Sequence, residues 1–386
     1  MNIMILGAGI AGLSSALFLK RAGFDVTVYE RESSINTMGA GIVCWPNATF
    51  VLKQLDLESQ LIKYGNPVKE MTRLTSDNEC LGSINISTIN ETLNDISYSI
   101  LRKDLVNSLY QTALDASVTF KFNHQVENIQ TENNKAMVRF SNDQYKTADI
   151  ILGADGRMHS QARLYVSGNN QPKYQGFSNW VGICESEDLL FDEKTIQDFW
   201  GVGSRFGLVP ISNKTCYWAM GLKENTQTNK DMNQQQLLKL SENFPDKIKQ
   251  IIKNTNQKTI KKIFVHDHDT IKLWHKNNLL LIGDSAHAPL PTSGQGACQA
   301  LVDAWLFSTL IKESTLNKVG NNKVGAVFET FTQRRIVQTH SIMQSGRFLA
   351  SSIFNDDQNY CKQRNAQAKQ SDYNQMAQAM SQAWKI

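Results

Sequence analysis

The sequence predicts an α/β fold: a Rossmann-like dinucleotide-binding domain with an inserted substrate domain built on an antiparallel β-sheet, followed by a helical C-terminus. Three observations predict it. Residues 1–30 read as strand, glycine-rich turn, helix and second strand. Short β-rich runs dominate residues 174–264, with one polar helical stretch between them. Residues 277–297 then return to a buried strand, followed by Gly-Asp and a loop rich in Pro and Gly.

The glycine-rich turn has the spacing of a phosphate-binding loop. Gly7, Gly9 and Gly12 follow the apolar run 3–6 and precede a helix-forming run that Gly23 ends. Gly7 permits the tight turn, Gly9 lets a pyrophosphate approach the backbone, and Gly12 lets the helix pack closely on the strand. The helix N-terminus offers free N–H groups and the positive end of its dipole to phosphates. The turn therefore predicts a dinucleotide site.

An acidic residue completes this motif. Glu30 follows the second strand, residues 25–29, close to where a ribose hydroxyl would lie. We assign its neighbour Arg31 to the same site. An ordinary α/β turn rich in glycine is the alternative, and the presence of strand, helix, second strand and acid in register argues against it.

Bulk composition indicates a globular protein long enough for two domains with sizeable cores. The chain has 386 residues, of which 41% are hydrophobic and 20% charged. A net charge of +4 without a long basic run argues against a nucleic-acid partner. No stretch of eighteen residues is uniformly apolar, so we expect no membrane span. Six cysteines without C-x-x-C spacing predict a cytoplasmic protein with reduced thiols, and we expect no bound metal.

The region around residue 100 predicts two strands and a helix. Residues 71–76 and 81–87 alternate in polarity and predict strands of a separate sheet. Residues 99–109 carry apolar side chains at helical spacing and predict a helix that begins at residue 99. Arg102 lies near its start, where a cation opposes the helix dipole. An anionic partner and a solvated surface arginine are the two interpretations of Arg102.

Two later segments predict the ligand edge of a parallel sheet. An apolar strand runs into Asp155, and a second one runs into Asp284, each beside a glycine. Parallel strands end at one edge of their sheet, where ligands bind. Gly294 and Gly296 then precede a strong helix at residues 297–312. The start of this helix is a second N-terminus that can accept an anion.

The motifs and their order resemble those of the single-component FAD-dependent aromatic hydroxylases, the para-hydroxybenzoate hydroxylase-like group. The resemblance covers residues 1 to about 345. Its most specific part is Gly283-Asp284-Ser-Ala-His287-Ala-x-x-Pro291-x-x-Gly294-Gln295-Gly296. The branch that holds salicylate, 3-hydroxybenzoate 6- and urate hydroxylases is similar in Gly39-Ala-Gly-Ile-x-x-Trp45-Pro46-Asn47-Ala48.

The resemblance implies how FAD is held at its adenosine and phosphate end. Gly9 and Gly12 would hold the pyrophosphate, Glu30 the adenosine ribose, and Arg102 would contact the phosphate side.

The resemblance also implies how the flavin end is held. Asp155 would serve both FAD and the reduced nicotinamide cofactor, and Asp284 would meet the ribityl chain and phosphates. Gly294, Gly296 and Ala297 would lie beside the isoalloxazine ring, where the helix dipole favours negative charge on the reduced ring.

The implied reaction is the hydroxylation of a small aromatic or related ring compound. NADH or NADPH would act as a transient hydride donor, since the chain has no second G-x-G-x-x-G motif. Oxygen would add at flavin C4a, and the resulting hydroperoxide would attack an electron-rich ring carbon. The protein would position the ring and keep water out.

Arg205 and Tyr217 are the candidate substrate residues, because relatives of the urate hydroxylase kind have an Arg and a Tyr at these places. A turn at residues 212–214 predicts a hairpin that brings the two residues together. Arg205 would bind an anion and Tyr217 would position the ring or assist proton removal. A packed sheet Arg and a packed Tyr are the structural alternative.

We therefore expect residues 1–70, 99–172 and 269–345 to form the FAD-binding domain, residues 71–98 and 173–268 the substrate domain, and residues 346–386 a C-terminal helical segment. The protein would be a monomer or homodimer whose partners are the aromatic substrate and O2. A flavoprotein monooxygenase that modifies or inactivates a larger molecule, such as a tetracycline-like polyketide, is the alternative function. A non-catalytic dinucleotide-binding regulator is disfavoured, because all three cofactor motifs are present.

Overall fold

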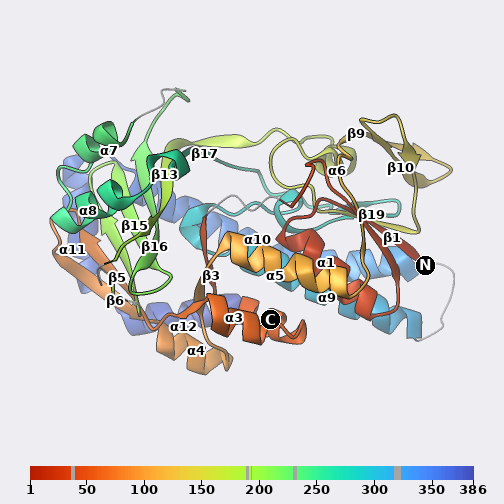
Figure 1. Cartoon of the computed structure of the whole chain (residues 1–386), viewed down its shortest axis with the longest axis horizontal. Coiled ribbons are helices and arrows are strands. Elements are labelled where there is room, and N and C mark those ends of the chain that lie inside the picture. The colour runs from red at the N-terminus through yellow and green to blue at the C-terminus, as the bar shows by residue number, and fades with distance from the viewer. Residues whose placement is uncertain (36–39, 188–190, 193, 229–232, 317–322) are drawn as a thin grey trace.

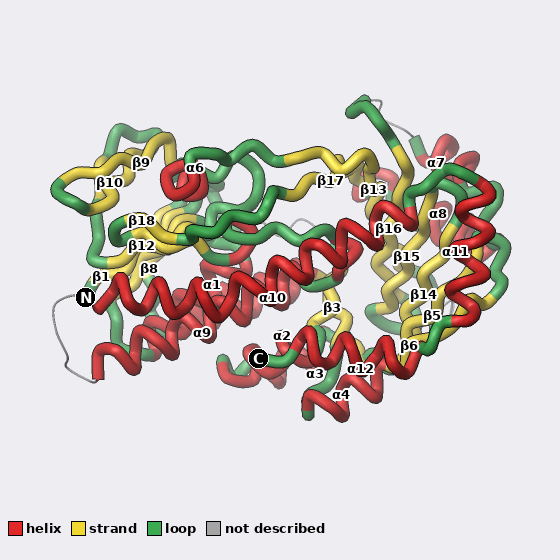
Figure 2. Tube along the Cα trace, turned by 180° about the vertical axis from the view of Figure 1, so that it is seen from behind, coloured by secondary structure: helices red, strands yellow, loops and turns green. Residues whose placement is uncertain are grey.

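The computed structural model describes residues 1–35, 40–187, 191–192, 194–228, 233–316 and 323–386. Its two large sheets lie at opposite ends of the molecule, and long helices run between them (Figures 1 and 2). Gly39, which belongs to one of the predicted motifs, lies outside the described residues.

A six-stranded sheet forms the N-terminal end and has the order β18-β19-β12-β1-β2-β8. All neighbouring strands in it are parallel except the edge pair β18 and β19. Its central strands are apolar and fully covered, as parallel strands with helices on their faces should be. The strands are β1 (Asn2–Leu6), β2 (Asp25–Tyr29), β8 (Thr119–Lys121), β12 (Ile150–Gly153), β18 (His275–Lys276) and β19 (Leu279–Leu281).

A seven-stranded sheet forms the other end and has the order β17-β13-β16-β15-β14-β5-β6. It is antiparallel apart from the parallel pair β14 and β5. The hairpin expected to carry Arg205 and Tyr217 is present as β15 and β16. The strands are β5 (Glu70–Thr75), β6 (Cys80–Asn85), β13 (Lys173–Glu185), β14 (Thr195–Trp200), β15 (Ser204–Pro210), β16 (Thr215–Lys223) and β17 (Lys261–Asp267).

Helices connect and cover the sheets. The helix α9 packs on α1, and α10 continues from the first sheet to the second, where Ile353 and its neighbours enter a small core beside the seven-stranded sheet (Figure 2). The helices are α1 (Ile10–Arg21), α2 (Pro46–Gln54), α3 (Glu58–Tyr64), α4 (Ile86–Leu93), α5 (Arg102–Asp115), α6 (Gln161–Ser167), α7 (Gln234–Leu240), α8 (Asp246–Asn254), α9 (Gly296–Leu316), α10 (Lys323–Ile353), α11 (Gln358–Gln370) and α12 (Tyr373–Trp384).

Two small sheets complete the fold. One has the order β11-β10-β9, from strands β9 (Val126–Glu132), β10 (Lys135–Phe140) and β11 (Tyr145–Lys146). The other has the order β3-β7-β4, from strands β3 (Gly41–Cys44), β4 (Asn66–Pro67) and β7 (Tyr98–Leu101). The sequence prediction that a helix begins at residue 99 is wrong, because residues 98–101 pair with β3 and β4 and the helix begins at Arg102.

The fold class is confirmed: a Rossmann-like sheet, an inserted and largely antiparallel sheet, and a helical C-terminus are all present. The polar helical stretch of the insert consists of two helices, α7 and α8, because Pro245 stands at the start of the second. No helix in the described ranges is long and apolar enough to cross a bilayer. The domain boundaries expected above remain our proposal.

Candidate active site

The glycine loop between β1 and α1 has the geometry that its sequence predicts. A Cβ at Gly12 would lie 2.0 Å from the carbonyl oxygen of Gly7, so only glycine permits this approach of helix to strand. Gly7 itself has φ of 103°, in the region that favours glycine. A Cβ at Gly9 would meet no described atom within 4 Å. The backbone at the start of α1 is therefore open to a ligand.

Glu30 lies against this loop. Its Oε2 accepts a hydrogen bond of 2.7 Å from the N–H of Ala8, and its Oε1 accepts one of 3.0 Å from the N–H of Glu32. These bonds fix the carboxylate beside the open backbone of Gly9. Arg31 behaves differently, because its side chain is 59% exposed and pairs with Glu32 at 3.3 Å.

Asp284 and Arg102 lie together at the same edge of the sheet. Asp284 follows β19 in the short 3₁₀ turn 283–285, and its Oδ2 is 3.1 Å from an Nη of Arg157. A Cβ at Gly283 would lie 2.8 Å from the Cβ of Ala11, so this turn packs on the first turn of α1. Burial lowers the pKa of Arg102, and the nearby carboxylate of Asp284 opposes that shift. Arg102 thus has the anionic neighbour that one interpretation required.

Asp155 accepts hydrogen bonds from the start of a helix at this edge. It accepts a hydrogen bond from the hydroxyl of Ser160 and one of 3.1 Å from the N–H of Ala162, at the start of α6. Burial raises the pKa of Asp155, and these hydrogen bonds oppose the shift. Arg163, on α6, donates to the carbonyls of Ser285 and Ala286 at 3.0 and 3.1 Å. The Asp155 turn is therefore connected to the turn that carries Asp284.

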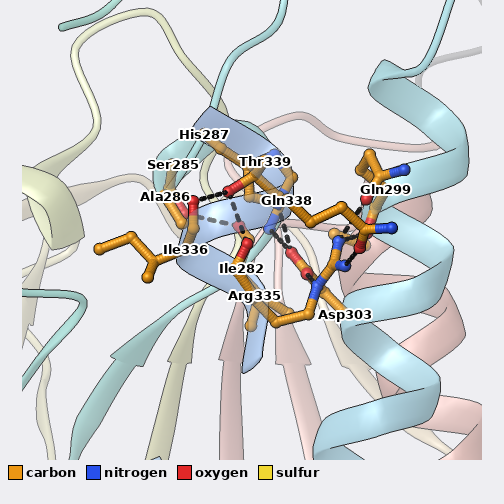
Figure 3. A network of polar contacts seen from close by, with 12 residues as sticks. Ile282, Ser285, Ala286, His287, Gln299, Asp303, Arg335, Ile336, Gln338 and Thr339 are labelled. Carbon is orange, nitrogen blue, oxygen red and sulfur yellow. Dashed lines mark hydrogen bonds and ion pairs between the residues drawn. The ribbon is translucent and has the colours of Figure 1, made fainter. Parts of the chain in front are cut away.

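A buried network of polar contacts supports the Asp284 turn from below (Figure 3). Asp303, on α9, is fully buried and accepts from the N–H of Gly283 at 2.8 Å and from Nε2 of His287 at 2.6 Å. Its other oxygen accepts from Nε of Arg335, on α10, at 2.7 Å. These partners lower the pKa of Asp303 to about 2 in spite of its burial. Asp303 therefore holds the turn as a charged group.

A cavity of about 610 Å³ lies against one face of the seven-stranded sheet. Its walls come from the β3 strand, the loop 291–297, the helices α10 and α12, and one face of the seven-stranded sheet. Gly294, Gly296 and Ala297 line it on one side, and Arg205 and Tyr217 line it from the sheet. The structure thus brings the predicted flavin-ring residues and the predicted substrate residues to one cavity.

Alternation along the sheet explains which side chains reach this cavity. Residues at odd positions of β15, Arg205, Gly207 and Val209, line it, whereas Phe206 and Leu208 pack into the core under α7 and α8. The small Gly207 pairs with Ala219 in the middle of the sheet. Small residues at this point leave room for a ligand.

Arg205 is already paired with a carboxylate. Its Nε donates to Oδ1 of Asp198 at 2.5 Å, and Oδ2 of Asp198 accepts from Nε1 of Trp200 at 2.9 Å. The Asp198 side chain is 7% exposed. The positive charge of Arg205 is therefore balanced within the protein, which the sequence did not suggest.

Tyr217 packs over the backbone of β3, since a Cβ at Gly41 would lie 2.5 Å from its side chain. Burial raises the pKa of Tyr217 to about 12, and the charge of Arg205 opposes this shift. The phenol is thus protonated at neutral pH and can donate a hydrogen bond, but it is a poor general base there. In the described part of the cavity wall no Asp, Glu, His, Lys or Cys is present.

Aromatic and amide side chains hold the loop of Gly294. Nε1 of Trp45 donates to the Gly294 carbonyl at 3.0 Å, and the Trp45 ring lies 4.9 Å from the ring of Trp384, on α12. Gln295 is buried and accepts from Asn47 at 3.0 Å. The C-terminal helix therefore forms part of the cavity wall.

Several supporting residues could not be found from the sequence. Asp303 and Arg335 lie inside helices, where a charged residue usually indicates a solvated face. Asp198 lies seven positions before Arg205, and only the hairpin register brings the two together.

The arrangement fits FAD. The open backbone at Gly9, the start of α1 and the adjacent Glu30 suit a pyrophosphate and a ribose. The turn that carries Asp284 lies between the starts of α1 and α9, since a Cβ at Gly283 would meet the Cβ atoms of Ala11 and Ala300 at 2.8 and 3.6 Å. This path leads from the dinucleotide loop to the cavity, as a flavin that reacts with a bound ring requires.

Comparisons with known proteins agree with this fit. The family model "FAD binding domain" matches residues 1–318. The aurachin C monooxygenase/isomerase of Stigmatella aurantiaca is 28% identical over 305 residues, which cover 79% of each chain. The FAD-dependent urate hydroxylase of Klebsiella pneumoniae is 26% identical over 318 residues, which cover 81% of this chain and 82% of the other.

Solved structures show the same fold. Klebsiella pneumoniae HpxO, in complex with FAD and uric acid, superposes with a TM-score of 0.89 at 22% identity and covers 100% of this chain and 96% of its own. A tetracycline destructase superposes with a TM-score of 0.71 at 20% identity, over 100% of this chain and 98% of its own. The chain therefore belongs to the FAD binding domain family, and it is a flavoprotein monooxygenase.

Proposed function

We propose that this enzyme uses NADH or NADPH and O2 to hydroxylate a small aromatic or related ring compound. The observation that carries the proposal is the shared cavity, in which Arg205 and Tyr217 face the loop of Gly294 and Ala297. Relatives named urate hydroxylase and 6-hydroxynicotinate 3-monooxygenase act on nitrogen-containing rings and support this class of substrate. We infer a cytoplasmic protein, since all six cysteines are free thiols, and we propose that it is a monomer or homodimer.

The residues of the cavity have separate tasks in this proposal. When bound, FAD supplies the chemistry of hydride acceptance and oxygen transfer. Gly294, Gly296 and Ala297 hold the flavin side of the cavity, and Tyr217 donates a hydrogen bond that positions the ring. The apolar wall from α12 excludes water from the reacting atoms.

The substrate has to be electron-rich without help from a protein base. Besides Tyr217 and two arginines, the described cavity wall carries no titratable side chain. A phenolic substrate would therefore bind as its anion or lose its proton to water, and the arginines would stabilise that anion.

A second candidate is a flavoprotein monooxygenase that modifies a larger molecule such as a tetracycline-like polyketide. The cavity of about 610 Å³ favours it, because this volume is in the range that holds drug-sized ligands. The fold shared with a tetracycline destructase is compatible with it.

One screen distinguishes these candidates. The purified FAD-loaded protein is mixed with NADH or NADPH and with aromatic acids, purines, quinolones or tetracyclines, and products are weighed by mass spectrometry. We expect faster cofactor oxidation and a product heavier by one oxygen atom for a ring compound. Cofactor oxidation that no compound accelerates, with no oxygenated product, would contradict the proposal.

A further inference from the structure

A second arginine, Arg73, lines the cavity from β5, and its charge is not balanced. β5 pairs with β14 in parallel, with Arg73 directly beside Asp198. Met71 and Arg73 reach the cavity, while Leu74 faces the opposite core. Nε of Arg73 is buried without a hydrogen-bond partner, and none of the ion pairs formed by the described residues involves Arg73.

The neighbouring arginines Arg205 and Arg364 already have partners within the protein. Arg205 has its charge balanced by Asp198. Arg364, on α11, donates to the backbone carbonyls of Ser352, Ile353 and Gly201 at 3.0 to 3.2 Å. Among the described residues that line the cavity, the two arginines are Arg73 and Arg205, and Asp198 forms its ion pair with Arg205, so this end of the cavity keeps the positive charge of Arg73.

Aromatic rings hold Arg73 in place without neutralising it. Its guanidinium carbon lies 5.1 Å from the ring centre of Trp200 and 5.8 Å from that of Tyr373, at the start of α12. A ring orients the guanidinium that lies over it, and the N–H groups of the guanidinium stay able to donate hydrogen bonds. A partly buried cation with free donors normally has a partner, because burial without one is costly. The partner has to come from the cavity.

The distance between Arg73 and Tyr217 sets how long a ligand has to be to contact both side chains. Tyr217 packs over Gly41 of β3 and is paired with Val209, while Arg73 lies beside Asp198, which pairs with Gly207. Arg73 and Tyr217 are therefore three strands apart across the sheet and about two residues apart along it, roughly 16 Å between their Cα atoms at ordinary sheet spacings. Side chains on one face of a sheet stand roughly perpendicular to it, so the ends of Arg73 and Tyr217 keep much of this separation, and a ligand that contacts both has to bridge it.

We propose that Arg73 binds an anionic group of the substrate and that the substrate is an elongated aromatic anion. Such a substrate has two or more rings, or one ring with an acidic arm. Its reacting ring lies between Tyr217 and the loop 294–297. Its carboxylate or other anionic oxygen accepts hydrogen bonds from the N–H groups of Arg73. The inference rests on the proposed function and names the class of its substrate.

Ligand binding without turnover tests this inference. The probes are 6-hydroxy-2-naphthoate, its neutral carboxamide, and the single-ring 4-hydroxybenzoate, and Kd is measured from the change in the absorption of protein-bound FAD. We expect the naphthoate to bind the wild-type enzyme at least tenfold more tightly than either other probe. Loss of one charge-assisted contact in Arg73→Gln should weaken the naphthoate about ten- to a hundredfold and the carboxamide less than threefold.

Two variants control for the structure. Arg73→Lys keeps the charge and should retain naphthoate binding within about tenfold of wild type. Arg139→Gln removes an exposed arginine of β10 that pairs with Glu127 in another sheet. This variant should change neither the Kd of the naphthoate nor that of the carboxamide. An unchanged naphthoate Kd in Arg73→Gln, an equal loss for both naphthalene probes, or a wild-type enzyme without preference for the naphthoate would overturn the inference. Since no turnover is measured, a failure to hydroxylate any compound would count against the proposed function alone.

Discussion

Replacing Asp303 by Asn should destabilise the protein more than any substitution of an exposed carboxylate. Asp303 is fully buried, and so is the guanidinium of its partner Arg335, at 2% exposure. The variant leaves that cation without its counter-charge. Breaking a buried pair on one side costs about 3–5 kcal/mol. The depression of the Asp303 pKa from 3.8 to about 2 gives the same order, about 2 kcal/mol, for its preference for the charged state.

The assay is urea unfolding of the FAD-free protein, followed by tryptophan fluorescence. We expect a lower unfolding midpoint for Asp303→Asn. The double variant Asp303→Leu/Arg335→Met should lose much less unfolding free energy than Asp303→Leu alone, because it leaves no unpaired charge of this pair buried. The matched control is Asp246→Asn, whose carboxylate is 90% exposed and pairs with Lys249; it should leave the unfolding midpoint nearly unchanged. A loss below 1 kcal/mol for Asp303→Asn, or additive effects in the cycle, would refute this reasoning.

The same carboxylate predicts how stability depends on pH. Its pKa is lower in the folded state, so the folded protein is stabilised at pH values above 3.8 and loses this contribution as the pH falls from about 4 to 2. Asp303→Asn should therefore flatten the acid limb of the stability curve over that interval. An unchanged acid limb would show that another group is responsible.

Three further predictions concern FAD and the substrate. Gly9→Ala should weaken FAD binding tenfold or more without changing the unfolding midpoint of the FAD-free protein. Gly12→Ala should weaken FAD binding and also lower that midpoint. Equal unfolding midpoints of the two variants in calorimetry would contradict this prediction. Asp284→Ala should lose bound FAD during gel filtration while circular dichroism stays native; full FAD occupancy would disprove its role. Tyr217→Phe should lower kcat and retain FAD. Since the Tyr217 pKa of about 12 keeps the phenol protonated, the pH dependence of kcat should have the same shape in both proteins from pH 6 to 9. A pH-dependent limb that is present in the wild type and lost in the variant would indicate that Tyr217 acts as a base.

The sequence predicted the parts of the site that local geometry determines. Gly7, Gly9 and Gly12 each have a requirement that the turn itself imposes, and Glu30 follows at a fixed distance. The β15–β16 hairpin could also be predicted, because a short turn joins two alternating runs. Arg205 and Tyr217 were therefore expected on one face, and the structure places both on the cavity wall.

The rest depends on contacts between distant segments. Residues 99–101 look helical in isolation, and pairing with β3 and β4 makes them part of a strand. Arg73 belongs to an ordinary alternating run, and its lack of a counter-charge is seen only in the structure, where Asp198 lies beside Arg73 in register but forms its ion pair with Arg205. The role of α12 as a cavity wall depends on the path of α10, which no local pattern specifies. Long-range pairing overrides local preference in each case.

The central claim is that this enzyme transfers one atom of O2 to a ring compound bound in the cavity beside Tyr217 and the loop 294–297. Turnover under ¹⁸O2 in ordinary water, with the compound that best accelerates NADH or NADPH oxidation, tests it most directly. We predict a product that carries one ¹⁸O atom for each hydroxyl group gained. A product whose new oxygen comes from water, or cofactor oxidation that yields only hydrogen peroxide with every compound, would contradict the claim.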